Sequence, residues 1–490
     1  MNLFSGSALI NSGDKIDIEA KTAKLHGTQK ALIHSDEEAV INSKGTAKMR
    51  ADKGTSHSNI AKKVECSNAE YIALAMVYFR PMGNWNGEYG FDWMREKDNN
   101  FFNEQNYESI ITGGYKDGKE DLTAQEAYEK LKLEYEVIPI KRKTLPNETK
   151  YAPAEYFVPY LTLFSKEFVT TKLALAEKKP CFEAELDILL DIETDLDQLK
   201  FEYDKTLFEL SLTVLDKKNK TNGLQPISTK IKITCLKDLD TNKEICIYAY
   251  PKGSMAKTAS ERLLARKLAG KIMVLKNDET VRKEEKIVLV PALTKIFNTS
   301  IQKNTFDEFE IDNIYNILYQ ALIIPQIKRA PILHLALNKE FQSEGEYLDE
   351  NNALKVINIK TGNAFKPTFT AVKDIFLNKD GNEIYKSEDY FTFFAFDIKS
   401  NHASLAGCAE DVGVRNVILL SERDNSTLAH EAVHGLGLYH THREHNKIKE
   451  INRRYIFKNS TTTNIISYAA KRNTSWCWQW QIINPNISNK

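Results

Sequence analysis

Cysteine is scarce in this sequence. Six Cys residues are spread over 490 positions, and no two of them form a C-x-x-C pair. So few residues, so widely spaced, do not make a disulfide framework, and they indicate synthesis in a reducing cytoplasm. Cys235 and Cys246 lie on β-rich runs that could pair as a hairpin, where we expect two buried thiols and no bridge.

An imbalance of charge and long apolar runs are also absent. Lys+Arg and Asp+Glu number 67 each, which gives no global reason to expect nucleic acid or an anionic membrane as a partner. No apolar run approaches the length that spans a bilayer, and the first residues lack the basic start and apolar stretch of a secretory signal peptide. If the protein acts outside its cell, we therefore expect a non-classical export route. With 42 % apolar and 27 % charged residues, the composition is typical of a globular chain of roughly two to four domains.

Residues 1–54 contain a repeat. Apolar residues occur in pairs two positions apart, and successive pairs are offset by 8, 7, 8, 8 and 8 residues. A spacing of two puts both side chains on one face of a strand, and a step near eight residues is typical of a β-solenoid or needle. So short a stack needs neighbours, so we expect it to form a trimer or to dock onto a similar stack. The alternative is a short polar β-meander packed on the rest of the chain. The pairs are Ala8/Ile10, Ile16/Ile18, Ala23/Leu25, Ala31/Ile33, Ala39/Ile41 and Ala47/Met49.

Three further regions follow the repeat, so the chain is expected to be multidomain. Residues 55–150 form an adaptor or linker region that is rich in aromatics and has one amphipathic helix predicted over 121–136. Residues 151–299 contain β-rich runs such as TKIKITC and EKIVLVP, which indicate an immunoglobulin-like sandwich. Residues 300–490 combine an amphipathic helix at 309–323 with strand-like runs and a His-rich segment, which predicts an α+β domain.

The segment that carries chemistry is HEAVHGLGLYH, residues 430–440, which reads H-E-x-x-H-x-x-G-x-x-H. His430 and His434 are four residues apart, so on a helix they share one face and can bind the same Zn²⁺. Asn425 and Ser426 are candidates for the N-cap of this helix. A match to all five defined positions has a chance frequency on the order of one in 10⁵. The alternative is a His-rich surface helix, since this part of the chain holds other His residues as well.

The third ligand and the reacting group follow from the same segment. Gly437 allows a left-handed turn that ends the helix, so that His440 can return and supply a third nitrogen. His442 and His445 compete for this role, but neither has the spacing that a turn at Gly437 serves. Three protein ligands leave one position for water, as in catalytic zinc sites. Glu431 lies off the ligand stripe and can take the proton of that water and pass it to the leaving amine.

The motif resembles the extended zinc motif of the metzincin clan of metallopeptidases. The resemblance implies a two-part catalytic domain, with the ligand helix at the floor of the cleft and a turn beneath the zinc that usually contains Met. The best match to this turn is the segment 464–468, NIISY, in which Ile466 stands at the Met position. Ile fills a similar apolar volume. In some metzincins a Tyr at the place of Tyr468 approaches the zinc or the oxyanion, and the alternative is a plain core Tyr.

Two further segments are similar to parts of that clan's cleft or could line it. The segment 405–409, LAGCA, resembles the edge strand to which substrate adds as an extra strand. Cys408 raises the idea of a cysteine latch, although nothing places its thiolate on the metal. The alternating residues Trp476, Trp478 and Trp480 are expected to be core or a packing lid, with a substrate-lining role as the alternative.

A second resemblance covers more of the chain and is less specific. The repeat looks like the C-terminal needle of type VI secretion spike proteins, and the stretches RPMGNWNGEYGFDWMR and SYAAKRNTSWCWQWQ resemble metallopeptidase effectors of that system in Bacteroidetes-type bacteria. This resemblance implies a zinc endopeptidase that is made in the bacterial cytoplasm, binds a spike or tube component and is injected into a target cell. The alternatives are a structural spike whose zincin domain is inactive, and a processing protease that acts inside the producer.

Overall fold

The computed structural model describes residues 71–96, 105–116, 119–143, 151–215, 225–294, 305–342, 345–378, 383–402, 404–443 and 453–489. The repeat predicted over residues 1–54 lies outside this part of the chain. The described residues up to Lys257 and from Glu261 onward belong to one compact unit. No helix in the described ranges has the length and apolar character needed to cross a bilayer.

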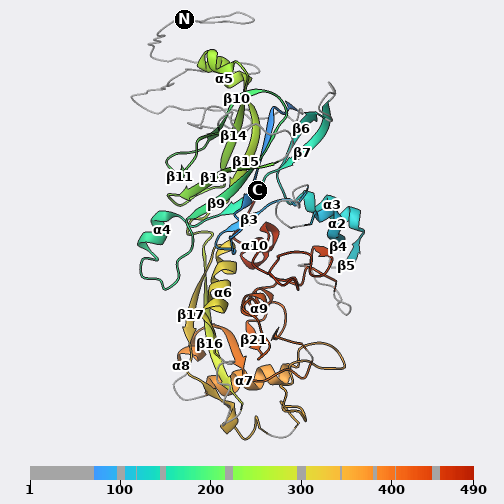
Figure 1. Ribbon diagram of the computed structural model, residues 1–490. Helices are drawn as coiled ribbons and strands as arrows, with labels where there is room; N and C mark the ends of the chain where they lie inside the picture. The colour runs from blue at the N-terminus through green and yellow to red at the C-terminus, as the bar shows by residue number, and fades with distance from the viewer. Residues whose placement is uncertain are drawn as a thin grey trace, which may run out of the picture. The chain divides into compact units, whose positions relative to one another are not determined.

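A β-sandwich forms the first part of this unit (Figure 1). Alternate residues of its two sheets, such as Ile188 and Ile231 on one and Ile247 and Ile272 on the other, meet in one buried cluster. One sheet has the order β12 (Val214–Leu215), β10 (Leu196–Glu202), β14 (Lys243–Pro251), β15 (Lys267–Val274), β8 (Tyr160–Thr162) and β3 (Gly90–Asp92). The other has the order β11 (Phe208–Leu210), β13 (Gln225–Cys235), β9 (Glu183–Ile192) and β2 (Ala75–Pro81).

Several short elements surround the sandwich. A small sheet has the order β1 (Tyr71–Ile72), β6 (Val137–Lys143) and β7 (Tyr151–Phe157). The helices in this part are α4 (Lys166–Thr171), the 3-10 turn η2 (Ser254–Ala256) and α5 (Ala259–Ala265).

The predicted sandwich was right in kind and wrong in two details. Strands β2 and β3 come from the region predicted as an adaptor, and they complete the two sheets. Cys235 lies on β13 and Cys246 on β14, which belong to different sheets, so the expected hairpin does not exist. Both thiols are nevertheless free, as expected, and Cys235 is the more deeply buried of the two.

The second part is a mostly parallel sheet with helices on both faces. The order is β17 (Ile323–Arg329), β16 (Lys283–Leu293), β19 (Phe391–Phe396), β21 (Asn416–Leu419) and β20 (Gly407–Ala409), and β18 (Leu333–His334) also pairs with β16. All pairs are parallel except β20 with β21, so the edge strand runs against its neighbour. The run EKIVLVP, predicted as sandwich, lies in β16 and belongs to this sheet.

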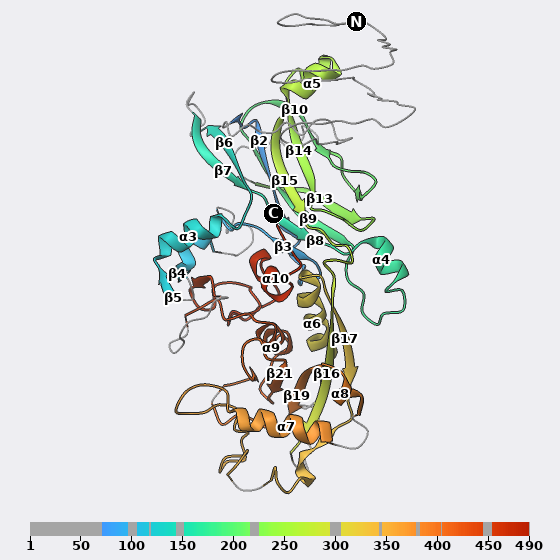
Figure 2. The same cartoon turned by 180° about the vertical axis from the view of Figure 1, so that it is seen from behind.

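Alternation along β16 explains the two layers of helices. Ile287 and Leu289 face the cluster that contains α6 (Glu308–Gln320) and α9 (Thr427–Gly435), while Val288 and Val290 face the cluster that contains α7 (Lys366–Asn378). Figure 2 shows α9 and α7 on opposite sides of β21. The helix predicted at 309–323 is α6, and it begins with a capping box between Asp307 and Glu310. The remaining short helices are η4 (Leu335–Leu337) and α8 (Glu383–Ser387).

The last part of the chain packs on its first described part. The strand β22 (Tyr455–Phe457) pairs with β4 (Ile111–Lys116), which pairs with β5 (Lys119–Leu122). The ring of Tyr107 lies 5.3 Å from that of Phe457 and 5.5 Å from that of Trp476, centroid to centroid. The predicted adaptor and the predicted C-terminal unit therefore share one core. Nearby helices are α2 (Tyr107–Ile110), α3 (Ala124–Lys132), which confirms the helix predicted over 121–136, and α10 (Cys477–Ile483).

Gln320, at the end of α6, joins these parts. Its side chain is fully buried, and its Nε2 donates to the carbonyls of Gly87 and Asn473, both at 3.0 Å. Its Oε1 accepts from the main-chain N–H and the hydroxyl of Ser475, both at 2.8 Å. Both ends of the Gln320 amide are therefore hydrogen-bonded. A buried polar group costs little free energy when its hydrogen bonds are made in this way.

We predict that Gln320→Leu lowers the free energy of unfolding by about 3 kcal/mol, because the substitution leaves four buried polar groups without their partner. Chemical denaturation of the full chain measures this loss. The matched control is Gln326→Leu on the exposed face of β17, for which we expect a change within about 0.5 kcal/mol. Equal effects of the two substitutions would contradict the role given to Gln320.

Candidate metal centre

The helix α9 begins where the sequence predicts it, but no side chain makes a capping bond to its first turn. Ser426 is the N-cap residue, yet its side chain makes no capping bond of its own. The carboxylate of Asp424 instead accepts from the Ser426 N–H at 2.9 Å and from the Ser426 and Thr427 hydroxyls at 2.7 and 3.0 Å. Burial raises the pKa of Asp424, but these bonds and the charge of Arg472 outweigh burial, so the net pKa lies below the usual value.

The helix ends at the predicted glycine turn. Gly437 has a φ of +106°, and its N–H donates to the carbonyl of His434 at 2.9 Å. The N–H of Leu438 donates to the carbonyl of Val433 at 3.0 Å, which completes a Schellman motif. The turn sends the chain back toward the helix, so that His440 reaches the two helical imidazoles.

Three imidazole nitrogens converge at one point. The Nε2 atoms of His430 and His434 are 3.1 Å apart, and the Nε2 of His440 lies 3.1 Å from the first and 3.0 Å from the second. Among the described residues, these three histidines form a cluster that could hold a metal ion. His442 is buried but does not belong to it, and His445 lies outside the described residues.

Main-chain carbonyls set the tautomers of the two helical ligands. The Nδ1 of His430 is 2.8 Å from the carbonyl oxygen of Ile465, and the Nδ1 of His434 is 2.6 Å from that of Leu438. A carbonyl can only accept, so each Nδ1 carries the proton and each Nε2 presents a lone pair. Burial, together with the neighbouring His434 and His440, holds the pKa of His430 well below its usual value, which also favours the neutral ligand form.

The spacing of the nitrogens fits a small divalent cation. Zinc–nitrogen bonds of about 2.0–2.1 Å in a tetrahedron place ligand nitrogens about 3.3 Å apart. The observed separations of 3.0 to 3.1 Å are close to this value. His430, His434 and His440 would therefore be the residues that hold such an ion.

Glu431 lies beside the ligands and is held by the edge strand β20. Its Oε2 accepts from the N–H of Ala409 at 2.9 Å, and its side chain is buried. Burial raises the pKa of Glu431 to about 7, against the opposing effects of the Ala409 bond and the charge of Arg472. The carboxylate therefore has one oxygen occupied by the protein, and Oε1 is the oxygen available for proton transfer.

The position of β20 depends on a glycine. A Cβ on Gly407 would lie 2.9 Å from Cγ of Glu431 and 3.0 Å from Cγ2 of Thr427. Only a residue without a side chain lets the strand approach the ligand helix this closely. Cys408 points to the other face of the sheet, where it packs against the α7 cluster, so the cysteine-latch idea is wrong.

The turn predicted near the metal lies against the ligands. Its Ile465 carbonyl binds His430, and Ile466, at the Met position, is fully buried. The Asn464 side chain forms two hydrogen bonds with that of Gln479, at 2.7 and 3.2 Å, which fixes the turn on α10. Trp476, Trp478 and Trp480 are buried at the start of α10, which favours their core role.

Tyr468 is not a core residue. Half of its surface is exposed, at 50 %. Its ring centroid lies 4.8 Å from that of His440, 4.5 Å from that of His442 and 6.0 Å from that of His430. The residue therefore stands at the open side of the ligand cluster.

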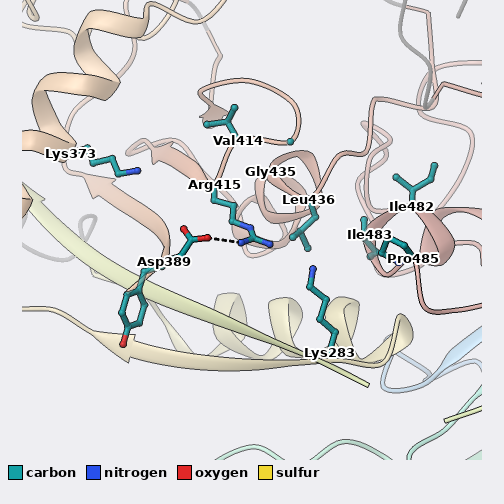
Figure 3. Close-up of a pocket in the computed structure, with 12 residues that line it drawn as sticks. Lys283, Lys373, Asp389, Val414, Arg415, Gly435, Leu436, Ile482, Ile483 and Pro485 are labelled. Atoms are coloured by element: carbon teal, nitrogen blue, oxygen red, sulfur yellow. Dashed lines mark hydrogen bonds and ion pairs between the residues drawn. The ribbon is translucent and has the colours of Figure 1, made fainter. Parts of the chain in front are cut away.

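A separate cavity of about 570 Å³ adjoins the C-terminal end of α9 at Leu436 (Figure 3). Lys283 and Arg415 face it, but each pairs with the buried Glu285 at 3.3 Å, and Arg415 also pairs with Asp389 at 3.2 Å. The charges of Lys283 and Arg415 are thus paired with acids of the same chain, and Lys373 also lines the cavity.

Sequence reasoning missed the residues that hold the site in place. Asp424, Arg472, Gln479 and the carbonyl of Ile465 all support the ligands, and none belongs to the motif. Asp424 carried a signal, because an acidic residue just before a predicted helix start favours capping. The others depend on contacts between segments far apart in the chain.

We predict that Gly407→Ala destabilises the protein by about 1–3 kcal/mol, because the new methyl group overlaps Glu431 and Thr427. Denaturant titration of the full chain measures this. Gly83→Ala is the control, since nothing lies within 4 Å of a Cβ there. A stable Gly407→Ala protein would show that β20 can move away from α9.

Comparison with known proteins adds no information about the function of this site. No protein-family model matches the sequence, and no curated protein matches it. What the centre does is therefore inferred from its own residues.

Proposed function

We propose that this protein is a zinc-dependent endopeptidase of the metzincin type. The observation that carries the proposal is the convergence of three Nε2 atoms within 3.1 Å, two of them with fixed tautomers, beside a buried glutamate. Zinc bound there supplies a Lewis acid and lowers the pKa of water to about 7. Three neutral nitrogens and an open fourth position are the donor set of catalytic zinc sites.

Glu431 acts as general base and then as general acid. The Ala409 N–H occupies Oε2 and orients the carboxylate, so Oε1 takes the proton of the attacking water. The same oxygen then delivers that proton to the nitrogen of the leaving amine. In this proposal Tyr468, which is half exposed and has its ring beside that of His440, donates its hydroxyl hydrogen to the developing oxyanion.

The edge strand β20 supports a peptide as substrate. Ala406 bonds toward the neighbouring strand through its carbonyl, and Glu410 does so through its N–H. Because bonded and non-bonded positions alternate in an antiparallel pair, the main-chain N–H and carbonyl of Gly407 point away from β21. The order of the described strands ends at β20, in which Gly407 is buried against α9 while Cys408 and Ala409 are partly exposed. An extended substrate can add there as a further strand, close to Glu431.

Delivery by a contractile, type VI secretion apparatus belongs to the same proposal. It depends on the eight-residue repeat of residues 1–54, which suits docking onto a spike or tube component, with a trimer as one way of closing the stack. A role as a purely structural spike fits the site less well, because a carrier has no use for a buried glutamate oriented beside three converging imidazoles.

The full chain is expected to carry about one zinc ion, and His434→Ala is expected to remove it, because two nitrogens bind zinc far more weakly than three. Elemental analysis after dialysis measures the content. His442→Ala is the control and is expected to keep zinc, since His442 lies outside the group of three. Full zinc content in His434→Ala would exclude the assigned centre.

Glu431→Gln is expected to keep zinc and the fold but to lose peptide hydrolysis by roughly 10²-fold or more, because the amide cannot accept the water's proton. Hydrolysis of a denatured protein substrate, followed by mass spectrometry, reports this loss. Unchanged turnover would show that another group is the base. Absence of hydrolysis in the wild type with zinc bound would favour an inactive zincin.

A further inference from the structure

Three consecutive residues anchor the entrance to α9 on two different elements. Arg423 Nε pairs with Oε1 of Glu310 at 2.6 Å, and the Asn425 carbonyl accepts from the side chain of Asn313 at 2.9 Å. Both of these partners lie on α6. Asp424, between them, binds a different element, through Nη2 of Arg472, which lies 2.9 and 2.7 Å from its two carboxylate oxygens.

Arg472 belongs to the segment that carries the turn beside His430. It follows Tyr468 by four residues, and the next residue, Asn473, returns to Thr463 through a main-chain hydrogen bond of 3.0 Å. Residues 463–474 therefore form a closed loop, which also contains the Ile465 carbonyl. The Arg472–Asp424 pair joins this loop to the segment that leads into the ligand helix.

The Arg472–Asp424 pair is expected to contribute little to the free energy of unfolding, but its position lets it align the ligand helix with the 463–474 loop. The Arg472 side chain is 11 % exposed, while that of Asp424 is 60 % exposed. Ion pairs so open to water contribute little to unfolding free energy. Asp424 nevertheless binds the N–H of Ser426, the N-cap residue of α9, so a shift of its carboxylate moves the start of the helix that presents His430 and Glu431 relative to the carbonyl that orients His430.

We propose that Arg472 is a positioning residue, which acts through Asp424 to hold the ligand helix and the 463–474 loop in register for metal binding. This inference depends on the proposed function for its metal, but it concerns a pair of residues that the zinc motif does not contain. Removing such a support lowers metal affinity by about 10- to 100-fold in metal sites of known design.

The test is a double-mutant cycle on the full chain with Arg472→Met and Asp424→Asn. Asp424→Asn keeps an oxygen for the cap and removes the charge, so it isolates the pairing. Zinc affinity, measured by competition with a chromophoric chelator, is expected to fall about 10-fold or more in each single variant. The double variant is expected to lose little beyond either single one, because the two side chains act as one unit.

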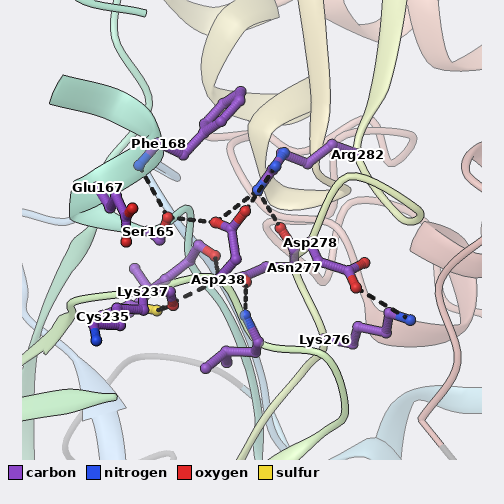
Figure 4. Close-up of polar contacts among 12 residues, drawn as sticks. Ser165, Glu167, Phe168, Cys235, Lys237, Asp238, Lys276, Asn277, Asp278 and Arg282 are labelled. Atoms are coloured by element: carbon purple, nitrogen blue, oxygen red, sulfur yellow. Dashed lines mark hydrogen bonds and ion pairs between the residues drawn. The ribbon is translucent and has the colours of Figure 1, made fainter. Parts of the chain in front are cut away.

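Arg282→Met is the matched control. Arg282 binds Asp238 through two hydrogen bonds of 2.8 and 2.9 Å, with side-chain exposures of 8 % and 39 %, and lies among the connections of the sandwich (Figure 4). Its loss is expected to leave zinc affinity unchanged. The visible spectrum of the Co²⁺-substituted protein is a second readout, and it is expected to change in Arg472→Met but not in Arg282→Met, because it reports ligand geometry.

The outcomes separate this inference from the proposed function. If the wild type binds zinc and the Arg472→Met protein matches it in affinity and Co²⁺ spectrum, the positioning role is wrong and the proposed function stands. Additive losses in the cycle would also overturn the positioning role. If the wild type binds neither metal, the proposed function fails first, and the inference fails with it.

Discussion

One hydrogen bond, from the side-chain Nδ1–H of His430 to the main-chain carbonyl of Ile465, joins the two parts of the candidate metal centre. It sets the tautomer of the first ligand, and its partners lie 35 residues apart in the sequence. Because a carbonyl has no side chain to adjust, its position depends wholly on how the turn at 464–468 is held. The Asn464–Gln479 pair holds one side of that turn, and the closed loop that ends near Arg472 holds the other.

The residues that hold this turn are themselves held by contacts with distant parts of the compact unit. Gln479 lies on α10, and Ser475, two residues before this helix, is bound by Gln320 at the end of α6. Gln320 also binds Gly87, from the loop that leads into a sandwich strand. The geometry of three imidazoles thus depends on segments from both ends of the described chain, and the sandwich is part of the frame of the centre.

The convergence of the three histidines could be predicted from the sequence because its geometry is local. Two His residues four apart need only a helix, and the return of His440 needs only the positive φ of Gly437. The Ile465 carbonyl could not be predicted, since a main-chain acceptor leaves no mark in the sequence. Nor could the pairing of Arg472 with Asp424, which spans 48 residues with no periodic pattern.

In the fold, too, some features could be predicted from the sequence and others could not. Sandwich strands such as β9 and β13 could be predicted from their alternation and β-branched residues. β16 was assigned to the wrong sheet, because a strand that is buried on both faces reads as a continuous apolar run, whichever sheet contains it. The division near residue 299 therefore separated β16 from the strands with which it pairs. Predictions for residues 1–54 remain predictions.

The pairing of β22 with β4, and the packing of Tyr107 on Trp476, have a consequence for biosynthesis. During translation the motif helix leaves the ribosome before α10 does, yet the turn that orients His430 is held by Gln479 on α10. Contacts so distant in sequence form late in folding. A nascent chain therefore presents its three histidines before the segment that orients them, residues 464–479, has been made. The order of synthesis thus separates the appearance of the three histidines from their alignment.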